Sequence, residues 1–511
     1  MTTHNTRSES DGPGGDYERL PYLSLPFAYS QPAHLAALAA LHGLAAPAAE
    51  SARVLELGCA SGGNIVPLAV RFPGARFVGL DLSERQIADG QRKIAALGLT
   101  NIDLRQADIA AVALPKSSFD YVICHGVYSW VPPAVQEAIL RLTGDVLSDT
   151  GVAAISYNVL PGWHLRSVLR DIFLLHAGKA GSPQDRVAAV RELLPKLAAA
   201  AQPTSPYGHV IAHEAKLLAK MPSSYILGEF LADYNLPCTF LDFAQRASSQ
   251  GLNYLCEADL GATARGVLKL DDRRVIAELG GNELHPTELY LDMFSGRPFR
   301  RSILVKSKGI GRIDAERMGP LHVSCHLKPD PAKGTDTLVA FTDGRGRSIA
   351  TEVPSIGAAL QKVGAAYPGS AAARDVAGEG RERSTVLRAL LNLAQDGRAT
   401  LSTLPLRAGR ADAARPTAWP LARAEAAAGL PGVTSLRHVT VALSKPARAI
   451  AAQLDGSRDR IELTQWLIAA IARGEVVAPE AATGASKASE AAALIDATLR
   501  HFGDCAVLAA D

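Results

Sequence analysis

A glycine-rich turn between a predicted strand and a predicted helix constrains this chain more than any other feature of its sequence. Residues 54–64 read VLELGCASGGN, so a short apolar run is followed by Gly58, Gly62 and Gly63. Glycine in such a turn permits backbone angles that other residues avoid and lets a ligand lie against the main chain. The sequence therefore predicts a strand, a ligand-binding turn and a helix here.

The pattern around this turn predicts a parallel sheet. Short apolar runs alternate with helical patterns from residue 53 to residue 156, which is typical of βαβ units. The expected strands are 53–57, 76–80, 102–106, 121–124 and 151–156, and the expected helices are 64–71, 84–97 and 133–147. A helical pattern follows over 165–219. Sheet-type pattern resumes at 252–256 and 299–305, which we expect to supply the last two strands.

Beyond residue 309 the pattern changes to a mixture of helices and short strands. A helix at 384–394 followed by a strand-like segment at 400–405 is typical of a helix and wing, and a helix–turn–helix pattern occupies 447–473. We therefore expect one or two winged-helix-like modules. Strand-like pattern covers 322–328, a low-complexity stretch at 371–383 is interpreted as a linker, and 479–487 is interpreted as a flexible connection.

Three features distinguish the turn from a dinucleotide-binding fingerprint, which also follows a first strand and has an acid about 20 residues on. Glu56 precedes the turn, Ala60 replaces the middle glycine, and a second acid, Asp108, follows the third predicted strand. In methyltransferases the cofactor ribose meets the acid after strand two, and its adenine amine meets the acid after strand three. Asp81 and Asp108 fit these roles. The alternatives are a helix-capping carboxylate for Asp81 and a solvated loop acid for Asp108.

Polar and aromatic residues also follow the fourth and fifth predicted strands, at the edge where open α/β sheets bind ligands. This edge is the expected transfer site. The alternatives are core packing for Tyr128 and Trp130, a satisfied polar group for His125, and a helix-entry role for Trp163 and His164. The sequence lacks the Asn/Asp-Pro-Pro-aromatic run of many nucleobase methyltransferases, which makes nucleobases less favoured substrates. The residues at this edge are His125, Tyr128, Trp130, Tyr157, Asn158, Trp163 and His164.

Several segments together resemble a known family. Residues 22–27, 56–64, 125–132 and 156–164, with further matches at 225–243 and 294–304, resemble class I S-adenosylmethionine-dependent methyltransferases that carry a methyltransferase regulatory domain. The rickettsial protein-lysine methyltransferases are similar. The resemblance implies an S-adenosyl-L-methionine cofactor and an N-terminal segment, residues 27–31, that folds over it. Residues 28–31 read AYSQ here, where such proteins usually have Pro-Gln-Thr-His.

The predicted fold class is α/β: a Rossmann-like seven-stranded methyltransferase domain with a helical insertion, followed by an α+β C-terminal region of winged-helix-like type. We expect a disordered tail (1–20), the first part of the methyltransferase domain (21–165), the helical insertion (166–237), a regulatory region with the last sheet strands (238–308), and a C-terminal winged-helix-like regulatory or substrate-recruiting region (309–511).

The candidate site residues follow from the motifs and the resemblance together. The expected cofactor-binding residues are Glu56, Gly58, Cys59, Ala60, Gly62, Asn64, Asp81, Leu82, Asp108, Ile109 and His125, and the expected catalytic residues are Tyr128, His125 and Asn158. A sulfonium cofactor is already activated, so the enzyme needs an in-line approach of a neutral nucleophile in a dehydrated pocket, without a metal.

The leading hypothesis is protein-lysine N-methylation, with the C-terminal modules and the helical insertion holding a protein acceptor. The alternative is O- or N-methylation of a small molecule in specialised metabolism. A third class is a cofactor-sensing protein whose winged-helix-like tail binds DNA. It would require a clustered basic face, but Arg407, Arg410, Arg415 and Arg423 are interspersed with alanine and acidic residues.

The composition limits the partners. There are 53 basic and 51 acidic residues, a net charge of +2, so no overall field recruits nucleic acid. The longest apolar stretch, 35–49, is too short and too broken to span a bilayer, so we expect no membrane partner. Six scattered cysteines without a CxxC pair suit a reducing cytoplasm. A homodimer is left open.

Overall fold

A computed structural model describes residues 23–178, 181–262, 269–477 and 487–510 of the chain. The predicted tail, 1–20, and nearly all of the predicted connection, 479–487, lie outside the described residues. Among those that are described, no helix combines the length and the apolar character needed to cross a membrane.

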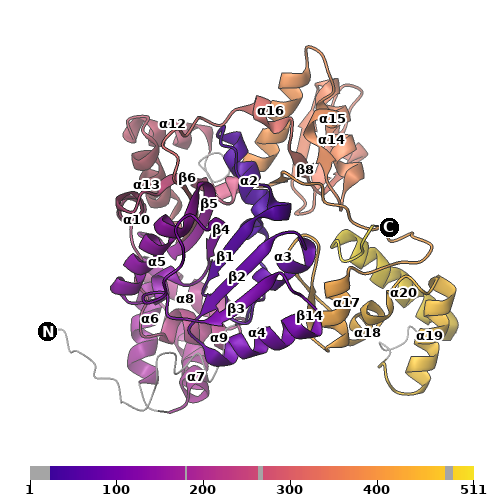
Figure 1. Cartoon of the computed structure of the whole chain (residues 1–511), viewed down its shortest axis with the longest axis horizontal. Helices are drawn as coiled ribbons and strands as arrows, with labels where there is room; N and C mark the ends of the chain where they lie inside the picture. Colours follow the sequence, from indigo (N-terminus) through magenta and orange to yellow (C-terminus); the bar gives the residue numbers. More distant parts are fainter. Residues whose placement is uncertain (1–22, 179–180, 263–268, 478–486, 511) are drawn as a thin grey trace.

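A seven-stranded sheet in the order β3-β2-β1-β4-β5-β7-β6 forms the centre of the N-terminal half (Figure 1). The first five strands run parallel, and β7 pairs antiparallel with both β5 and β6. The fold-class prediction is confirmed, including the last two strands. The strands are β1 (Arg53–Leu57), β2 (Arg76–Asp81), β3 (Ile102–Gln106), β4 (Phe119–Cys124), β5 (Leu147–Asn158), β6 (Asn253–Glu257) and β7 (Phe299–Val305).

The strand order reverses at β1, which pairs with β2 on one side and β4 on the other. In open α/β sheets a ligand binds outside the carboxyl ends of the strands at such a reversal. The helices between the strands are α3 (Ile65–Arg71), α4 (Glu84–Ala96) and α5 (Pro133–Val146). The start of α4 is fixed as predicted, because the Ser83 hydroxyl accepts a hydrogen bond from Gln86 N at 3.1 Å.

Both faces of the sheet are covered. One face packs against α2 (Pro32–Leu41), α3, α4 and the region after residue 309, in a core that includes Leu38, Leu68 and Leu390. The other face packs against α5 and α10 (Phe240–Ser249), in a core that includes Ile139 and Phe243. The sequence did not predict α2, because its nearly uninterrupted apolar residues show no helical period.

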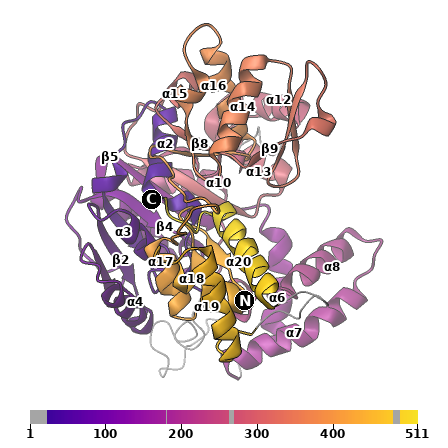
Figure 2. The same cartoon turned by 90° about the vertical axis from the view of Figure 1, so that its right-hand side faces the viewer.

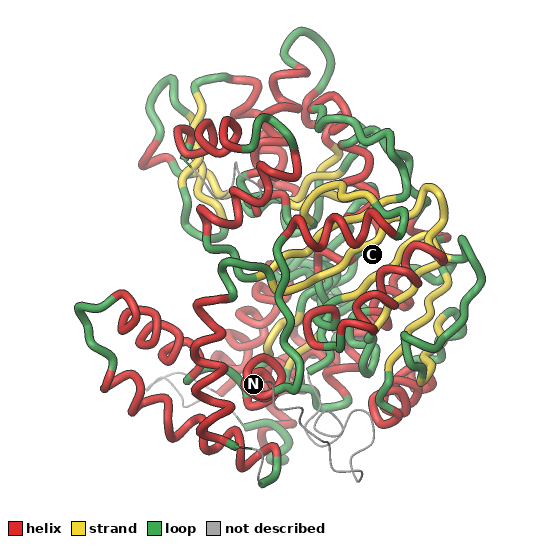
Figure 3. The backbone as a smooth tube through the Cα atoms, turned by 90° about the vertical axis from the view of Figure 1, so that its left-hand side faces the viewer, coloured by secondary structure: helices red, strands yellow, loops and turns green. Residues whose placement is uncertain are grey.

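The helical insertion forms a unit with its own core and projects from the sheet (Figure 3). Its helices are α6 (His164–Ala177), α7 (Pro183–Ala200), α8 (Pro206–Leu218) and α9 (Ser223–Ile226), and a π-helical turn (Leu227–Leu231) follows. Leu169, Phe173, Val190 and Phe230 are buried among these helices. The chain then returns to the sheet through α10, β6, α12 (Leu270–Leu279) and α13 (Leu284–Ser295).

The region after residue 309 divides into two parts (Figures 1 and 2). The first contains two small sheets and three helices: β8 (His322–Ser324), β9 (Leu327–Pro329), β10 (Val339–Asp343), β11 (Ser348–Thr351), α14 (Pro354–Ala366), β12 (Ala371–Ala372), α15 (Ala373–Ala377), α16 (Arg383–Gln395) and β13 (Thr400–Ser402). The linker prediction for 371–383 is wrong, because β12 pairs with β8 and Ala373 and Val376 are buried. The predicted strand at 322–328 is two strands in different sheets.

The second part is the C-terminal unit, with Trp419 and Phe502 in its core. The predicted helix–turn–helix at 447–473 is present. The elements are α17 (Pro420–Ala427), β14 (Gly432–Thr434), β15 (Thr440–Ala442), α18 (Lys445–Gln453), α19 (Arg460–Ala472) and α20 (Lys487–Asp504). This unit contacts the sheet domain, since Lys93 on α4 pairs with Glu425 on α17 at 3.1 Å.

Candidate cofactor and acceptor site

The glycine-rich turn has a backbone that only small residues tolerate. Gly58 has a φ of +73°, and a Cβ atom there would lie 2.2 Å from Val127 Cγ2. Gly62 and Ala60 also have positive φ, +76° and +49°. The first strand therefore leads into a loop of small residues whose backbone passes close to the segment after β4, as the motif predicts.

Glu56, near the end of β1, has one carboxylate oxygen that accepts a hydrogen bond and one that has no partner. Asn64 Nδ2 donates to Glu56 Oε1 at 2.7 Å, whereas the buried Oε2 has no hydrogen bond. Burial raises the pKa of Glu56 to about 8, against the effect of Asn64. The amino-acid group of S-adenosylmethionine carries an ammonium, and an unpaired carboxylate oxygen can accept a hydrogen bond from it. The residues present therefore fit this cofactor.

The two predicted ribose and adenine acids lie at the same edge. Asp81, the last residue of β2, accepts from Ala60 N at 2.8 Å and Ser83 N at 2.9 Å. Asp108 follows β3, which pairs with β2 up to Asp81, and it accepts from Ala110 N at 2.8 Å. Next to these acids the apolar side chains of Leu82 and Ile109 keep exposed surface, and they could contact the two faces of an adenine.

The side chain of Cys59 points under the glycine-rich turn. Its side chain is buried, and a Cβ on Gly79 of β2 would lie 2.7 Å from its sulfur. Burial raises the pKa of this thiol. Cys59 can therefore contribute backbone atoms to a cofactor, while its thiol packs under the turn.

A cluster around His125 occupies the carboxyl end of β4. Tyr29, from the N-terminal strap (residues 23–31), is hydrogen-bonded through its hydroxyl to His125 Nδ1. The Phe27 ring lies 3.7 Å from the imidazole centroid and Phe299 lies 6.0 Å away. Burial and, after it, the charge of Arg301 lower the pKa of His125 to about 3. His125 is therefore neutral and brings the strap to the predicted transfer site.

The side chain of Tyr128, which was predicted to be catalytic, is packed in the core. Its side chain is fully buried against Phe243 at 5.3 Å and Tyr157 at 6.1 Å, and its hydroxyl has no partner. The short helical turn after β4 directs it under α10, into the core on one face of the sheet. The structure therefore gives Tyr128 the packing role that was the alternative, and Tyr29 is the phenol beside His125.

Asn158, at the end of β5, has an oxygen available at the acceptor edge. Its Nδ2 donates to Asn235 Oδ1 at 3.2 Å, and its buried Oδ1 has no partner. Asn235 is held in turn, because its Nδ2 donates to the carbonyl oxygen of Glu229 in the π-helical turn. Burial raises the pKa of Glu229 to about 7. An amide oxygen in this position can accept a hydrogen bond from a substrate amine.

Three other residues predicted to line an acceptor channel have side chains that are packed in a core or lie at the start of a helix. Tyr157 stacks on Phe243 at 3.9 Å and is fully buried. Trp163 packs near Phe230 in the core of the insertion, and His164 is an exposed first residue of α6. Tyr157 therefore packs in the core, and Trp163 and His164 have the helix-entry role that the sequence left open for them.

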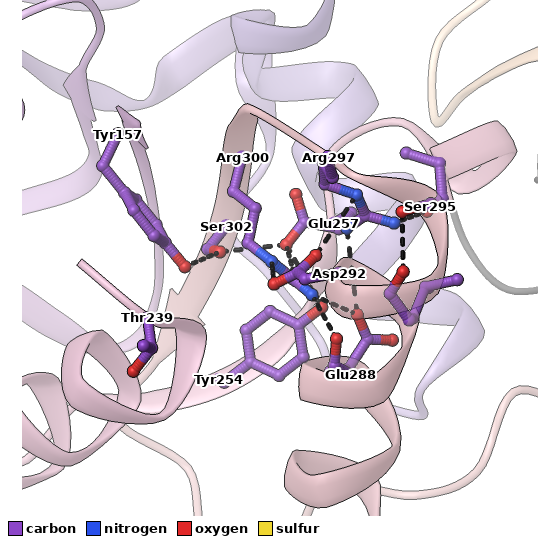
Figure 4. Close-up of polar contacts among 12 residues, drawn as sticks. Tyr157, Thr239, Tyr254, Glu257, Glu288, Asp292, Ser295, Arg297, Arg300 and Ser302 are labelled. Atoms are coloured by element: carbon purple, nitrogen blue, oxygen red, sulfur yellow. Dashed lines mark hydrogen bonds and ion pairs between the residues drawn. The ribbon is translucent and has the colours of Figure 1, made fainter. Parts of the chain in front are cut away.

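Strand alternation separates the two sides of β7. Phe299 and Arg301 contact the His125 cluster, with the Arg301 guanidinium 5.0 Å from the Tyr29 ring. Arg300 points the other way, into a buried ionic cluster with Glu257, Glu288, Asp292 and Arg297 (Figure 4). Glu257 also accepts from Arg301 N at 2.9 Å, so the cluster holds the strand that presents Arg301.

Sequence reasoning missed Tyr29, Arg301, Asn235 and Glu229 as site residues. The departure at 28–31 from the usual family run was the one available signal for Tyr29. The others come from segments that the sheet topology brings to the edge, and their types alone do not distinguish them from surface residues.

Comparisons with known proteins agree with this geometry. A family model described as a methyltransferase domain matches residues 54–151, a predicted methyltransferase regulatory domain matches 222–306, and a PKMT C-terminal winged helix domain matches 414–505. The structure of PKMT2 from Rickettsia typhi in complex with AdoHcy is similar over 96% of this chain and 100% of that chain, with 25% identity and a TM-score of 0.84.

Two proteins of Rickettsia prowazekii are related in sequence. The uncharacterized protein RP789 is 35% identical over 356 residues, which are 67% of this chain and 64% of that protein, just under two thirds of its length. The uncharacterized protein RP028 is 32% identical over 240 residues, 47% of this chain and 96% of that protein. The chain therefore belongs to the S-adenosylmethionine-dependent methyltransferases that carry a regulatory domain and a PKMT-type winged helix domain.

Proposed function

We propose that the protein transfers a methyl group from S-adenosylmethionine to the Nζ atom of lysine in a protein acceptor. The observation that carries this proposal is the match to PKMT2 over nearly the whole chain, the C-terminal winged helix domain included. The cofactor supplies an activated methyl group, and the chain has to orient and deprotonate the acceptor.

The electrostatics of the His125 cluster suit a lysine acceptor. A lysine must be neutral to attack, and its ordinary pKa is about 10.4. Burial and the charge of Arg301 lower the pKa of His125 from 6.5 to about 3. Burial and the positive charge of Arg301 would lower the pKa of a lysine amine at this edge in the same direction. Desolvation and Arg301 thus favour the nucleophilic form near neutral pH.

Orientation of the amine would come from the oxygens at this edge. Asn158 Oδ1 is buried and unpartnered, and the Tyr29 hydroxyl lies beside the neutral His125. Both accept hydrogen bonds from an amine and leave its lone pair free for in-line attack. We therefore assign Tyr29, His125 and Asn158 to the acceptor, and Glu56, Asp81 and Asp108 to the cofactor.

The helical insertion is our proposed contact surface for the protein acceptor. Leu165, Leu175 and Tyr207 on this projecting unit are 51%, 87% and 59% exposed. The unit has its own core and projects from the sheet, so it can present these side chains to a partner without a change in the sheet domain. The six free cysteines suit a reducing compartment, so we place the reaction in the cytoplasm.

The proposal is tested by incubating the purified protein with radiolabelled S-adenosylmethionine and host lysate, then separating protein, nucleic-acid and small-molecule fractions. We expect label on protein, lost in Asp81→Ala and retained in Asp103→Ala, which removes an exposed acid of β3. Label confined to small molecules would contradict the proposal and favour an O- or N-methyltransferase of specialised metabolism.

A further inference from the structure

The C-terminal unit reaches into the cofactor site through the hairpin of β14 and β15. His438, in the turn of this hairpin, lies 2.9 Å through Nε2 from Asn64 Oδ1. Asn64 stands at the end of the glycine-rich turn, 374 residues earlier in the chain. A residue of the winged helix domain is therefore in direct contact with the first cofactor motif.

Asn64 joins three separate segments through one side chain. Its Oδ1 also accepts from Phe27 N at 2.9 Å and Ser30 Oγ at 3.0 Å, both in the N-terminal strap. Its Nδ2 donates to Glu56 at 2.7 Å. The amide orientation is fixed, because the Phe27 N–H can only donate and must face an oxygen. A change at His438 would thus act on the strap and on Glu56 together.

His438 has features that a solvent-exposed turn residue would not need. It is 3% exposed and has a φ of +60°, which is uncommon for a residue with a side chain. Burial and, after it, the charge of Arg71 lower its pKa to about 3. The imidazole is therefore neutral, and its Nε2–H donates to Asn64 across physiological pH.

A second set of contacts holds the same hairpin against the strap. Arg71, the last residue of α3, donates through Nη1 to the carbonyl oxygen of Leu436 at 2.9 Å and to Gln31 Oε1 at 2.6 Å. Gln31 Nε2 donates to the carbonyl oxygen of Arg437 at 3.3 Å. Strap, turn and hairpin are thus connected at two places.

We propose that the winged helix hairpin completes the cofactor site, with His438 as the positioning residue for Asn64. Through Asn64 it fixes Glu56, which faces the cofactor ammonium, and the strap that covers the site. Cofactor affinity then depends on how the winged helix domain packs against the sheet domain, although the winged helix domain contributes no predicted cofactor contact of its own. This inference rests on the cofactor assignment and not on the identity of the acceptor.

The test is calorimetric titration of AdoHcy into the full chain. We expect His438→Ala to raise the Kd about tenfold, the effect of one lost hydrogen bond. His438→Gln keeps an amide N–H donor at about the reach of the imidazole Nε2, so it should restore the Kd to within about threefold of wild type. Val439→Ala, a change at the exposed neighbouring residue, should leave the Kd unchanged.

A role in folding alone would lower Tm without moving the Kd. A Kd for His438→Ala within twofold of wild type would overturn the inference, as would equal loss in His438→Ala and His438→Gln. If His438→Ala does not fold, hydrogen exchange on wild type decides: AdoHcy should protect the amides of 435–440, and unchanged exchange there overturns the inference. Failure of wild type to bind AdoHcy would instead refute the cofactor assignment.

Discussion

Glu56 should release a proton when the cofactor binds. In the free protein the pKa of Glu56 is about 8, so only about a tenth of the population is ionised at pH 7. In the proposed assignment the cofactor brings an ammonium to the unpaired Oε2, and the nearby positive charge would favour the carboxylate. Binding at pH 7 should therefore release about 0.9 proton per site, and the Kd should fall about tenfold per pH unit between about pH 5.5 and 7.

Calorimetry in buffers of different ionisation enthalpy measures this proton directly. The range below pH 7 is chosen because an α-amino group, with a pKa of about 7.7–8.0, stays protonated there. We expect the slope to disappear in Glu56→Gln and to persist in Glu50→Gln, which changes an exposed carboxylate in the turn before β1. Buffer-independent enthalpies for wild type, or an unchanged slope in Glu56→Gln, would refute the reasoning.

The same pKa fixes how the stability of the free protein depends on pH. The pKa of Glu56 is raised above its ordinary 4.5, so the contribution of the neutral form is complete below about pH 4.5 and is lost as the pH rises through about 8. Thermal unfolding of wild type should therefore lose more stability toward pH 8 than that of Glu56→Gln. Equal losses would show that Glu56 is already ionised in the free protein.

Three further predictions concern single residues. Asp81→Ala should raise the Kd for AdoHcy at least about tenfold in calorimetry, since it removes a charged acceptor for two hydroxyls, and unchanged binding would exclude ribose contact. Tyr29→Phe should lower kcat at least about tenfold and change the AdoHcy Kd by less than that factor, whereas Tyr128→Phe should leave kcat intact. The reverse order would return the catalytic role to Tyr128. Arg300→Met should lower the free energy of unfolding by about 3–5 kcal/mol in urea titration, because it removes the ion-pair partner of the buried Glu257. The control Arg105→Met removes an exposed pair and should lower it by less than about 1 kcal/mol. A similarly small loss in Arg300→Met would contradict the structural role of the cluster.

The parts of the site that are local in sequence could be predicted. Gly58, Asp81 and Asp108 lie within or directly after strands whose apolar runs are unambiguous, so the motif also gives their place at the sheet edge. The parallel pairing of the first five strands follows from the βαβ pattern, whereas their order in the sheet does not follow from that pattern alone. Even the antiparallel β7 forms where the sheet-type pattern resumes, although the helical insertion separates it from β5.

The parts that depend on tertiary packing could not be predicted. Tyr29 meets His125 across 96 residues and His438 meets Asn64 across 374, and no periodicity relates these positions. Tyr128 was assigned to the site because it follows β4, but a short helical turn directs it into the core. The side to which a residue points after a strand ends depends on such turns, which a single sequence does not specify.

The most direct test of the account is tandem mass spectrometry of protein acceptors after reaction with S-adenosylmethionine carrying a deuterated methyl group. We predict deuterated methyl on lysine Nζ with wild type, and its loss with Tyr29→Phe although that variant still binds AdoHcy. Deuterated methyl on a small molecule or on another side chain, with none on lysine, would contradict the central claim.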